Sequence, residues 1–329
     1  MNVAETHKVA IFAPRLDCSF KEGPYSASFT GPFGTPNHTL REHWERFLIL
    51  LGNIHESFGD EVTYIIKPLW KMSPSDVEGM GYDRIYIPHK HKFQFDCGPG
   101  SRYYMQMVIP NIFSIDEEGW CAGASTYPIV PNPMFSGKFC SLRSRIWDNQ
   151  SKFPQPPRDA SFVEENYILF LCQIPHDETI KIHSDISVAD ALRNTLKLGK
   201  KLDKKVIVKG HPINPASMTA LKKIVEEENG PIWVDNMNLH QLIEQCDFVA
   251  TVNSGSGLEA LLHHKRVLAF GRADYDGCLN VFSSPDEIEL AIKQGLTHNP
   301  YDDVKFIETW YQNHYDVNFL PSFEKLLYK

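Results

Sequence analysis

The 329-residue sequence has no apolar run that approaches the length needed to cross a bilayer, which excludes an integral membrane protein built from spanning helices. Its first residues carry an early acidic side chain, Glu5, and only a short apolar run. They therefore lack the basic region and the long apolar region of a signal peptide. We expect a cytoplasmic protein with no membrane span, for which peripheral association with a membrane stays open.

Paired cysteines and an excess of positive charge are also missing. The seven cysteines are an odd number, scattered along the chain without a Cys-x-x-Cys pair, and this pattern predicts reduced thiols. The formal net charge of −8 disfavours nucleic acid as a partner, because phosphate backbones are bound by basic surfaces.

Several short functional motifs are absent as well. There is no Walker loop, no Gly-x-Gly-x-x-Gly dinucleotide motif and no Gly-x-Ser-x-Gly elbow of a serine hydrolase. His89, His91 and the pair His263-His264 have no carboxylate or cysteine at metal-ligand spacing, so no metal site is predicted. We interpret His263 and His264 as partners of a helix dipole.

What is present is an alternation of strands and helices. Apolar strands are predicted at 8–13, 62–66 and 84–88, with a helix over 37–58 and a long functional loop over 14–36. The proline-rich segment 128–157 is predicted to have little regular structure. After it, the alternation is unbroken from the strand at 167–172 to the strand at 266–270.

This pattern predicts an α/β fold of two facing Rossmann-like lobes with a cleft between them. The first lobe is expected to span residues 1–160 and the second residues 161–300. Residues 301–329 are expected to form helices that pack back on the first lobe.

Two polar loops in the second lobe predict an anion site. Lys209-Gly-His211-Pro212 follows one strand, and Asn253-Ser254-Gly255-Ser256-Gly257 follows another and opens a helix. Parallel strands end at a common edge where ligands bind, and glycines and serines let a phosphate approach backbone and hydroxyl donors. The structural alternatives are a turn with a surface histidine and an ordinary capped helix. Glu259 either accepts hydrogen bonds from a ribose or only favours the helix start.

Carboxylates at two further strand ends are candidates for chemistry. Asp177 follows the first strand of the second lobe, where it can act as nucleophile or base on an anomeric carbon with His176 orienting it. Glu117 and Glu118 follow a strand of the first lobe and are candidates for the acid or base of a carboxylate pair. The alternative for all three is an exposed, idle acid.

As a set, these motifs resemble the bacterial capsule polysaccharide biosynthesis family, which contains the retaining β-Kdo glycosyltransferases that use CMP-Kdo. The resemblance lies in Gln173-x-x-x-Asp177, Lys209-x-His-Pro, the Ser254-Gly-Ser-Gly-Leu-Glu-Ala-Leu segment and Val267-x-x-Phe-Gly-x-x-x-Tyr275-Asp-Gly. It covers mainly residues 165–280. Trp120-Cys-Ala stands where the family usually has Phe-Leu-Arg, which leaves recognition of the acceptor or of the donor carboxylate open.

The resemblance implies a GT-B-like fold, with the acceptor on the first lobe and the nucleotide-sugar on the second. It implies a metal-independent enzyme without a cofactor, whose partners are a nucleotide-sugar donor, CMP-linked, and a glycan acceptor. The implied catalytic residues are Asp177 as nucleophile, Glu117, Glu118 and His211. The implied donor-binding residues are Gln173, Lys209, His211, Asn253, Ser254, Gly255, Ser256, Gly257 and Glu259.

Other functions stay open at this point. A glycosyltransferase that uses a UDP- or GDP-sugar, or a sugar-nucleotide epimerase, would have the same two lobes. A nucleotide- or glycan-binding protein without catalysis is the alternative outside the enzymes.

Overall fold

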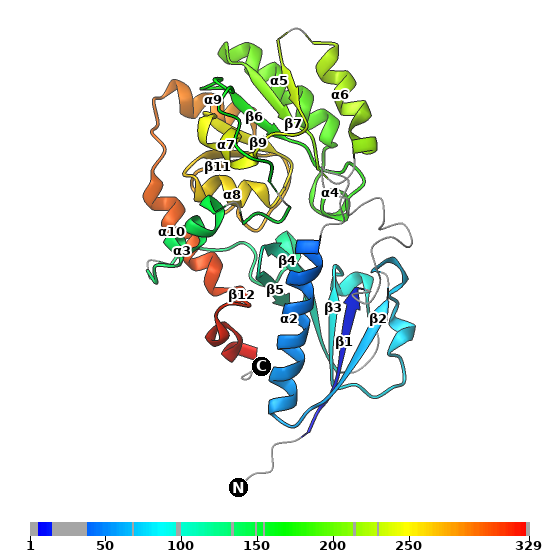
Figure 1. The fold of residues 1–329 in the computed structure, drawn as a ribbon. Coiled ribbons are helices and arrows are strands. Elements are labelled where there is room, and N and C mark those ends of the chain that lie inside the picture. The colour runs from blue at the N-terminus through cyan, green and yellow to red at the C-terminus, as the bar shows by residue number, and fades with distance from the viewer. Residues whose placement is uncertain are drawn as a thin grey trace. The chain divides into compact units, whose positions relative to one another are not determined.

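The computed structural model of the chain describes residues 6–14, 38–67, 69–96, 100–132, 135–148, 150–153, 155–212, 215–228 and 230–326. The predicted functional loop over 14–36 lies outside these residues, apart from Pro14. The chain divides into two compact units (Figure 1). The described part of the first comprises residues up to Tyr127 and from Gln312 onward, and that of the second comprises Pro128–Tyr311.

The first unit is built on a mixed sheet. Its strands are β1 (Lys8–Pro14), β2 (Glu61–Lys67), β3 (Arg84–Pro88), β4 (Ser101–Ile109), β5 (Ile112–Asp116) and β12 (Tyr315–Asp316). Its helices are α2 (His38–Ser57) and the short 3-10 turns η1 (Leu69–Lys71), η2 (Pro74–Asp76), η3 (Lys92–Gln94), η4 (Cys121–Gly123) and η6 (Leu320–Leu326).

The strand order in this sheet is β12-β5-β4-β3-β1-β2. The pairs from β2 to β4 are parallel, whereas β5 pairs antiparallel with both β4 and β12. The first unit is therefore Rossmann-like on one side of its sheet and antiparallel on the other. The C-terminal segment belongs to the first unit only from Gln312 onward, where its described part forms β12 and η6, whereas Pro300–Tyr311 of α10 (Pro300–Gln312) belong to the second unit.

The second unit is built on a sheet whose strand pairs are all parallel. Its strands are β6 (Ile168–Leu171), β7 (Val206–Lys209), β8 (Ile232–Val234), β9 (Phe248–Thr251), β10 (Arg266–Ala269) and β11 (Val281–Phe282). Its helices are α3 (Lys138–Trp147), α4 (Glu178–His183), α5 (Val188–Leu202), η5 (Pro215–Met218), α6 (Thr219–Glu226), α7 (Leu239–Gln245), α8 (Ser256–Leu262), α9 (Pro285–Lys293) and α10.

The order of these strands, β11-β10-β9-β6-β7-β8, is that of a Rossmann fold. Alternate strand residues such as Phe170, Val208 and Ala250 are buried against α5, α6 and α9, while α8 contacts β9 and β10. The chain reverses its direction of winding between β6 and β9, which are neighbours. Loops that leave the carboxyl ends of such a pair flank the usual ligand-binding crevice of this fold.

The boundary between the units corrects the predicted one. It lies between Tyr127 and Pro128, not near residue 160, because the proline-rich segment packs on the second unit. The backbone N–H of Asn132 donates to Thr309 Oγ1 (2.8 Å), and Asn238 Nδ2 donates to the carbonyl of Pro156 (2.8 Å). The segment also contains α3, which contacts α8. Prolines obscured this helix in the sequence because they flank it on both sides.

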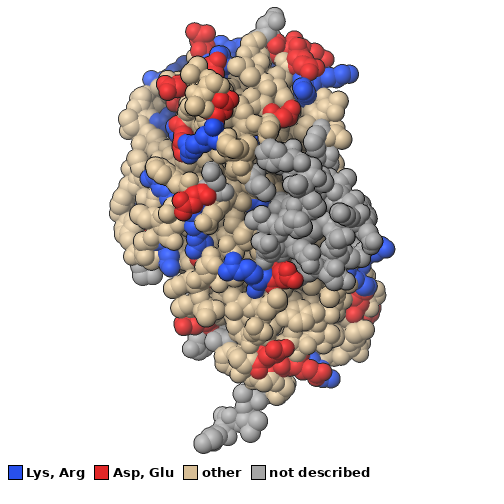
Figure 2. Space-filling model, viewed as in Figure 1, with Lys and Arg blue, Asp and Glu red and all other residues tan. Residues whose placement is uncertain are grey.

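The described surface offers no simple clue to a partner. On the face shown in Figure 2, lysine and arginine side chains are interspersed with aspartate and glutamate. None of the helices in the described ranges is long and apolar enough to cross a membrane.

Candidate functional site

The candidate site lies in the second unit, where loops leave the carboxyl ends of β6, β7 and β9. Asp177 follows β6, His211 follows β7, and Ser254–Gly257 follow β9 and lead into α8. The predicted placement of these three loops at one sheet edge is confirmed by the strand order.

The Ser254–Gly257 loop is held in shape from below by Tyr275. The Tyr275 hydroxyl donates a 2.7 Å hydrogen bond to the carbonyl of Ser254, which also accepts from the N–H of Gly257 (2.8 Å). A β-carbon on Gly257 would lie only 2.4 Å from the Tyr275 hydroxyl oxygen. Only a residue without a β-carbon allows this close approach, which explains the glycine at position 257. Tyr275, which belongs to one of the motifs of the family resemblance, supports the loop.

Gly257→Ala is expected to lower the free energy of unfolding by about 1–3 kcal/mol, because the added methyl overpacks a buried contact with a rigid ring. Urea unfolding measures this. Gly255→Ala is the matched control, since Gly255 is exposed with helical angles of φ −55° and ψ −21°. Equal losses in the two variants would contradict the role of Tyr275.

Gln173 and Asn253 form a buried, hydrogen-bonded pair that joins the ends of β6 and β9. Gln173 Nε2 donates to Asn253 Oδ1 (2.9 Å), and Gln173 Oε1 accepts from the N–H of Asn253 (2.9 Å) and from Thr251 Oγ1 (3.2 Å). Asn253 Nδ2 donates to the carbonyl of Thr179 (3.1 Å). Their polar groups are thus used within the protein, which revises their predicted role from donor contact to positioning of the loops.

Lys209 is likewise directed into the protein. It is 9% exposed, and its ammonium donates to the carbonyl of Asp235 (2.9 Å), which ties β7 to the segment after β8. Burial lowers the pKa of Lys209 to about 8. We therefore revise its predicted role from phosphate contact to support of the His211 turn.

His211 keeps its predicted place at the edge. Its ring lies edge-on to Phe153, with ring centroids 5.7 Å apart. Burial lowers the pKa of His211 to about 4, against the opposing effect of the Asp177 carboxylate. At neutral pH the imidazole is therefore uncharged, and it can offer a phosphate an N–H donor but not a positive charge.

A further ionisable group near this edge, Lys152, was not predicted from the sequence. Burial lowers the pKa of Lys152, while the carboxylates of Asp177 and Glu259 raise it. Lys152 also lowers the pKa of His211, so it lies within electrostatic reach of Asp177, His211 and Glu259. The residue was missed because it belongs to the proline-rich segment and follows no strand.

The side chain of Asp177 is held in place by hydrogen bonds to the start of α4, the helix that it caps. Its Oδ1 accepts hydrogen bonds from the backbone N–H (2.9 Å) and the hydroxyl (2.8 Å) of Thr179, which makes it the N-cap of α4. Thr179, and not His176 as predicted, therefore orients the carboxylate. Oδ2 makes no hydrogen bond with the residues that the structure describes.

Glu259 is the buried acid of the site. It is 4% exposed, and its Oε1 accepts from Ser151 Oγ (3.3 Å). Burial raises the pKa of Glu259 to about 7, against smaller opposing effects of hydrogen bonds and of Lys152.

A chain of histidines continues from this acid into the unit. Ser151 Oγ lies 2.5 Å from His240 Nε2, and His240 Nδ1 lies 3.1 Å from His263 Nε2. Burial lowers the pKa values of His240 to about 3 and of His263 to about 4, so both rings are neutral at pH 7. In such a chain of neutral rings all hydrogen bonds can point the same way. His263 then donates to His240, His240 donates to Ser151, and Ser151 donates to Glu259. It holds the side chain of Ser151, the residue that precedes Lys152.

Glu259→Gln is expected to flatten the dependence of stability on pH. In the wild type the folded carboxyl ionises near pH 7 and the unfolded one near 4.5, so stability present at pH 4.5 is lost as the pH rises through 7. The shift corresponds to about 3 kcal/mol.

Urea unfolding at pH 5 to 8 compares the two proteins. Glu226→Gln, on the exposed side of α6, controls for loss of a carboxylate. Parallel pH profiles for wild type and Glu259→Gln would show that the buried acid is not titrating in this range.

The other predicted acids belong to the first unit. Glu117 and Glu118 are exposed on a loop organised by Asp116, whose buried carboxylate accepts from the N–H groups of Glu118 (2.9 Å) and Ser125 (2.8 Å). Glu118 also pairs with Lys92. The loop is therefore well defined, and the prediction that one of these acids works with Asp177 stays a prediction.

Comparison with known proteins supports the resemblance. Residues 145–278 match the family described as capsule polysaccharide biosynthesis protein, which confirms the predicted resemblance over that segment. The capsule polysaccharide export protein KpsS of Escherichia coli is 27% identical over 130 residues, a match that covers 36% of this chain and 33% of that protein. The match thus spans about a third of the curated relative's length.

Two solved structures resemble the chain over nearly its whole length. The Thermosulfurimonas dismutans KpsC beta Kdo 2,4 transferase has a TM-score of 0.53 at 13% identity, covering 93% of this chain and 90% of its own. The beta Kdo 2,7 transferase of the same KpsC has a TM-score of 0.52 at 15% identity, covering 98% and 100%. At these identities the likeness shows the fold, and the predicted GT-B-like α/β class is confirmed.

Proposed function

We propose that the chain is a glycosyltransferase that transfers Kdo, or a related 2-keto sugar acid, from a CMP-linked donor to a glycan acceptor in capsule polysaccharide synthesis. The observation that carries the proposal is the group formed by Asp177, His211, Lys152 and Glu259 at the carboxyl edge of the second sheet. It combines a carboxylate, an uncharged imidazole, a lysine and a buried acid. The similarity to capsule proteins and to Kdo transferases supports the choice of sugar and pathway.

The donor is proposed to bind through its phosphate and its ribose. Lys152 supplies charge to the phosphate, and His211 and the loop Ser254–Gly257 supply hydrogen-bond donors. Glu259, when ionised, accepts from the ribose hydroxyls. Lys209, Gln173 and Asn253 hold these groups in place.

The proposed reaction is a double displacement. Asp177 Oδ2 attacks the anomeric carbon while the bond from that carbon to the phosphate oxygen breaks, and CMP leaves with the electron pair. An acceptor hydroxyl then displaces Asp177 from the same carbon and gives up its proton to a base, for which Glu117 or Glu118 is the candidate. Two inversions give net retention. Positive charge on Lys152 stabilises the negative charge that develops on the leaving phosphate.

Thermal unfolding with CMP, UDP, GDP and inorganic phosphate tests the donor. A ligand that binds only the folded protein raises the melting temperature, so selective stabilisation by CMP is expected. Stabilisation by UDP alone would remove the CMP proposal in favour of a UDP-sugar enzyme. CMP binding together with a lack of both hydrolysis and transfer of CMP-Kdo, across a panel of glycan acceptors, would instead favour a nucleotide-binding protein.

A further inference from the structure

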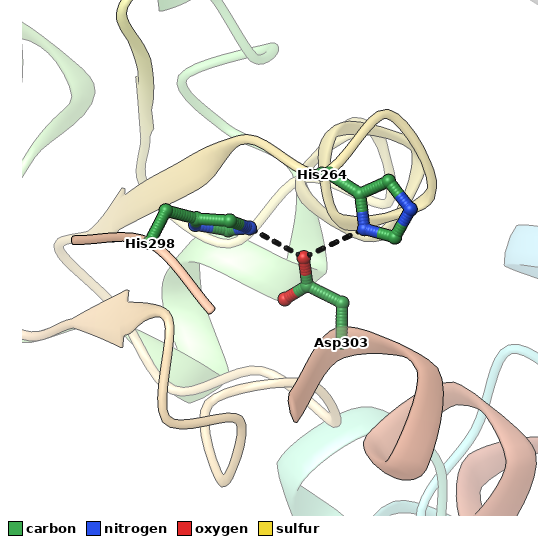
Figure 3. Close-up of side chains that lie close together, drawn as sticks. All are labelled: His264, His298 and Asp303. Atoms are coloured by element: carbon green, nitrogen blue, oxygen red, sulfur yellow. Dashed lines mark hydrogen bonds and ion pairs between the residues drawn. The ribbon is translucent and has the colours of Figure 1, made fainter. Parts of the chain in front are cut away.

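A second polar cluster lies in the same unit and uses none of the residues proposed for transfer. It consists of His264 after α8, His298 before α10 and Asp303 in the first turn of α10 (Figure 3). His298 Nε2 lies 2.6 Å and His264 Nδ1 3.3 Å from the same oxygen, Asp303 Oδ2. The carboxylate that His264 lacked at short sequence spacing is thus provided 39 positions later in the chain.

The charge of Asp303 has unusual surroundings for a buried acid. The side chain is fully buried, and its other oxygen accepts from Asn280 Nδ2 (2.8 Å) and lies 3.5 Å from Cys278 Sγ. In the described ranges no lysine or arginine forms an ion pair with it, and its ionic partners are the two imidazoles alone. A buried negative charge is costly unless a cation or several donors compensate it.

The ligand atoms are those that zinc prefers. In a tetrahedral site with bonds of about 2.0–2.1 Å to nitrogen and oxygen, neighbouring ligand atoms lie about 3.3 Å apart. The distance from Asp303 Oδ2 to His264 Nδ1 is already 3.3 Å. The distance to His298 Nε2 is that of a hydrogen bond, so the His298 ring must withdraw by more than half an ångström to admit an ion. All three ligand atoms lie within 4.8 Å of one another, and the side chains of His264 and His298 are 20% and 17% exposed.

The surroundings of the cluster orient two of its ligands, His264 and Asp303. The Phe139 ring stacks on His264 at 4.9 Å, and Asn280 Nδ2 holds both Asp303 and the carbonyl of Asn299 (3.0 Å). Metal ligands in proteins are usually oriented by such outer contacts.

The backbone gives a further sign. His264 has a φ of +54° at the position after the end of α8, where glycine is the favoured residue. A histidine that accepts this conformation brings its ring to Asp303, at a conformational cost that a glycine would avoid.

We propose that His264, His298 and Asp303 bind one divalent transition-metal ion of the zinc class, with solvent as the remaining ligand. The ion would replace the two hydrogen bonds to Asp303 Oδ2 and join the end of α8 and the segment before α10 to the start of α10. Each imidazole would carry its proton on the nitrogen that does not face the ion. This role is structural and independent of the proposed transfer reaction.

The test is a titration of chelator-treated protein with ZnCl2, followed by calorimetry and thermal unfolding. One equivalent is expected to bind, and a zinc concentration of a hundred times the Kd is expected to raise the Tm by about 5–10 °C. His298→Gln should lose this binding, whereas His176→Gln, which removes an exposed histidine outside the cluster, should retain it. Equal stoichiometry and affinity in wild type and His298→Gln would overturn the proposal.

Two further results keep the hydrogen-bond network apart from a metal site. If zinc leaves the Tm of the wild type unchanged while metal-free His298→Gln is less stable than wild type, the cluster is a hydrogen-bond network only and the proposal fails. X-ray absorption of the zinc-loaded wild type needs no variant, and it should show two imidazole ligands with the rest oxygen. A spectrum without two imidazoles would also overturn the proposal.

Discussion

Asp177→Asn is expected to lower the rate of sugar transfer from CMP-Kdo at least about a thousand-fold while CMP binding stays within about twofold of wild type. The amide is a far weaker nucleophile than the carboxylate, so the covalent step is lost. Asparagine also caps helices as well as aspartate does, so α4 and the hydrogen bonds to Thr179 should persist. Initial rates of transfer and calorimetric titration with CMP measure the two quantities.

Glu178→Gln is the matched control, because it removes the neighbouring, exposed carboxylate and should leave the rate within about twofold. Unchanged turnover in Asp177→Asn would remove the nucleophile assignment. Loss of turnover together with loss of CMP binding would show that the substitution disturbs the donor site. In that case Asp177→Ser, which also preserves the cap, decides the assignment.

Lys152→Met is expected to weaken CMP binding about 10–100-fold, because a charge-assisted contact to phosphate is worth about 1.5–3 kcal/mol. Methionine keeps much of the apolar stem of the half-buried side chain and removes only its charge. The loss should be larger for CMP than for cytidine, which has no phosphate. Calorimetric titrations with both ligands measure this difference.

Lys197→Met, on the exposed side of α5, controls for the overall change in charge. If Lys152→Met weakened CMP and cytidine equally, Lys152 would contribute to the shape of the site without contacting phosphate. The same pair of ligands applied to Lys209→Met should show little discrimination, since the ammonium of Lys209 is bonded to the carbonyl of Asp235.

Much of the second unit followed from local sequence patterns. The predicted alternation of strands and helices from residue 167 to residue 270 agrees with the structure, because amphipathic spacing and short apolar runs decide such elements locally. The helix α3 and the boundary at Tyr127 did not follow, since nearby prolines suggested an irregular segment and only packing on the second unit shows where it belongs.

The residues of the candidate site also divide into those that the sequence predicted and those whose roles the structure revised. Asp177, His211 and the Ser254–Gly257 loop were found because each follows a strand, and parallel strands in Rossmann order bring their ends together. The roles of Gln173 and Lys209 were revised because their hydrogen-bond partners, Asn253 and Asp235, are set by burial and not by position in a motif.

The amino-acid sequence by itself determined the α/β class, the loops that carry the candidate chemistry and the family resemblance, since these depend on periodicity and on motifs of a few residues. The tertiary structure decided which polar groups face one another. Ser151 reaches Glu259 across 108 positions and His264 reaches Asp303 across 39. Sequence spacing does not reveal such contacts, because local conformation does not decide them. They form only when the chain folds, brings the two polar groups together and removes water from around them.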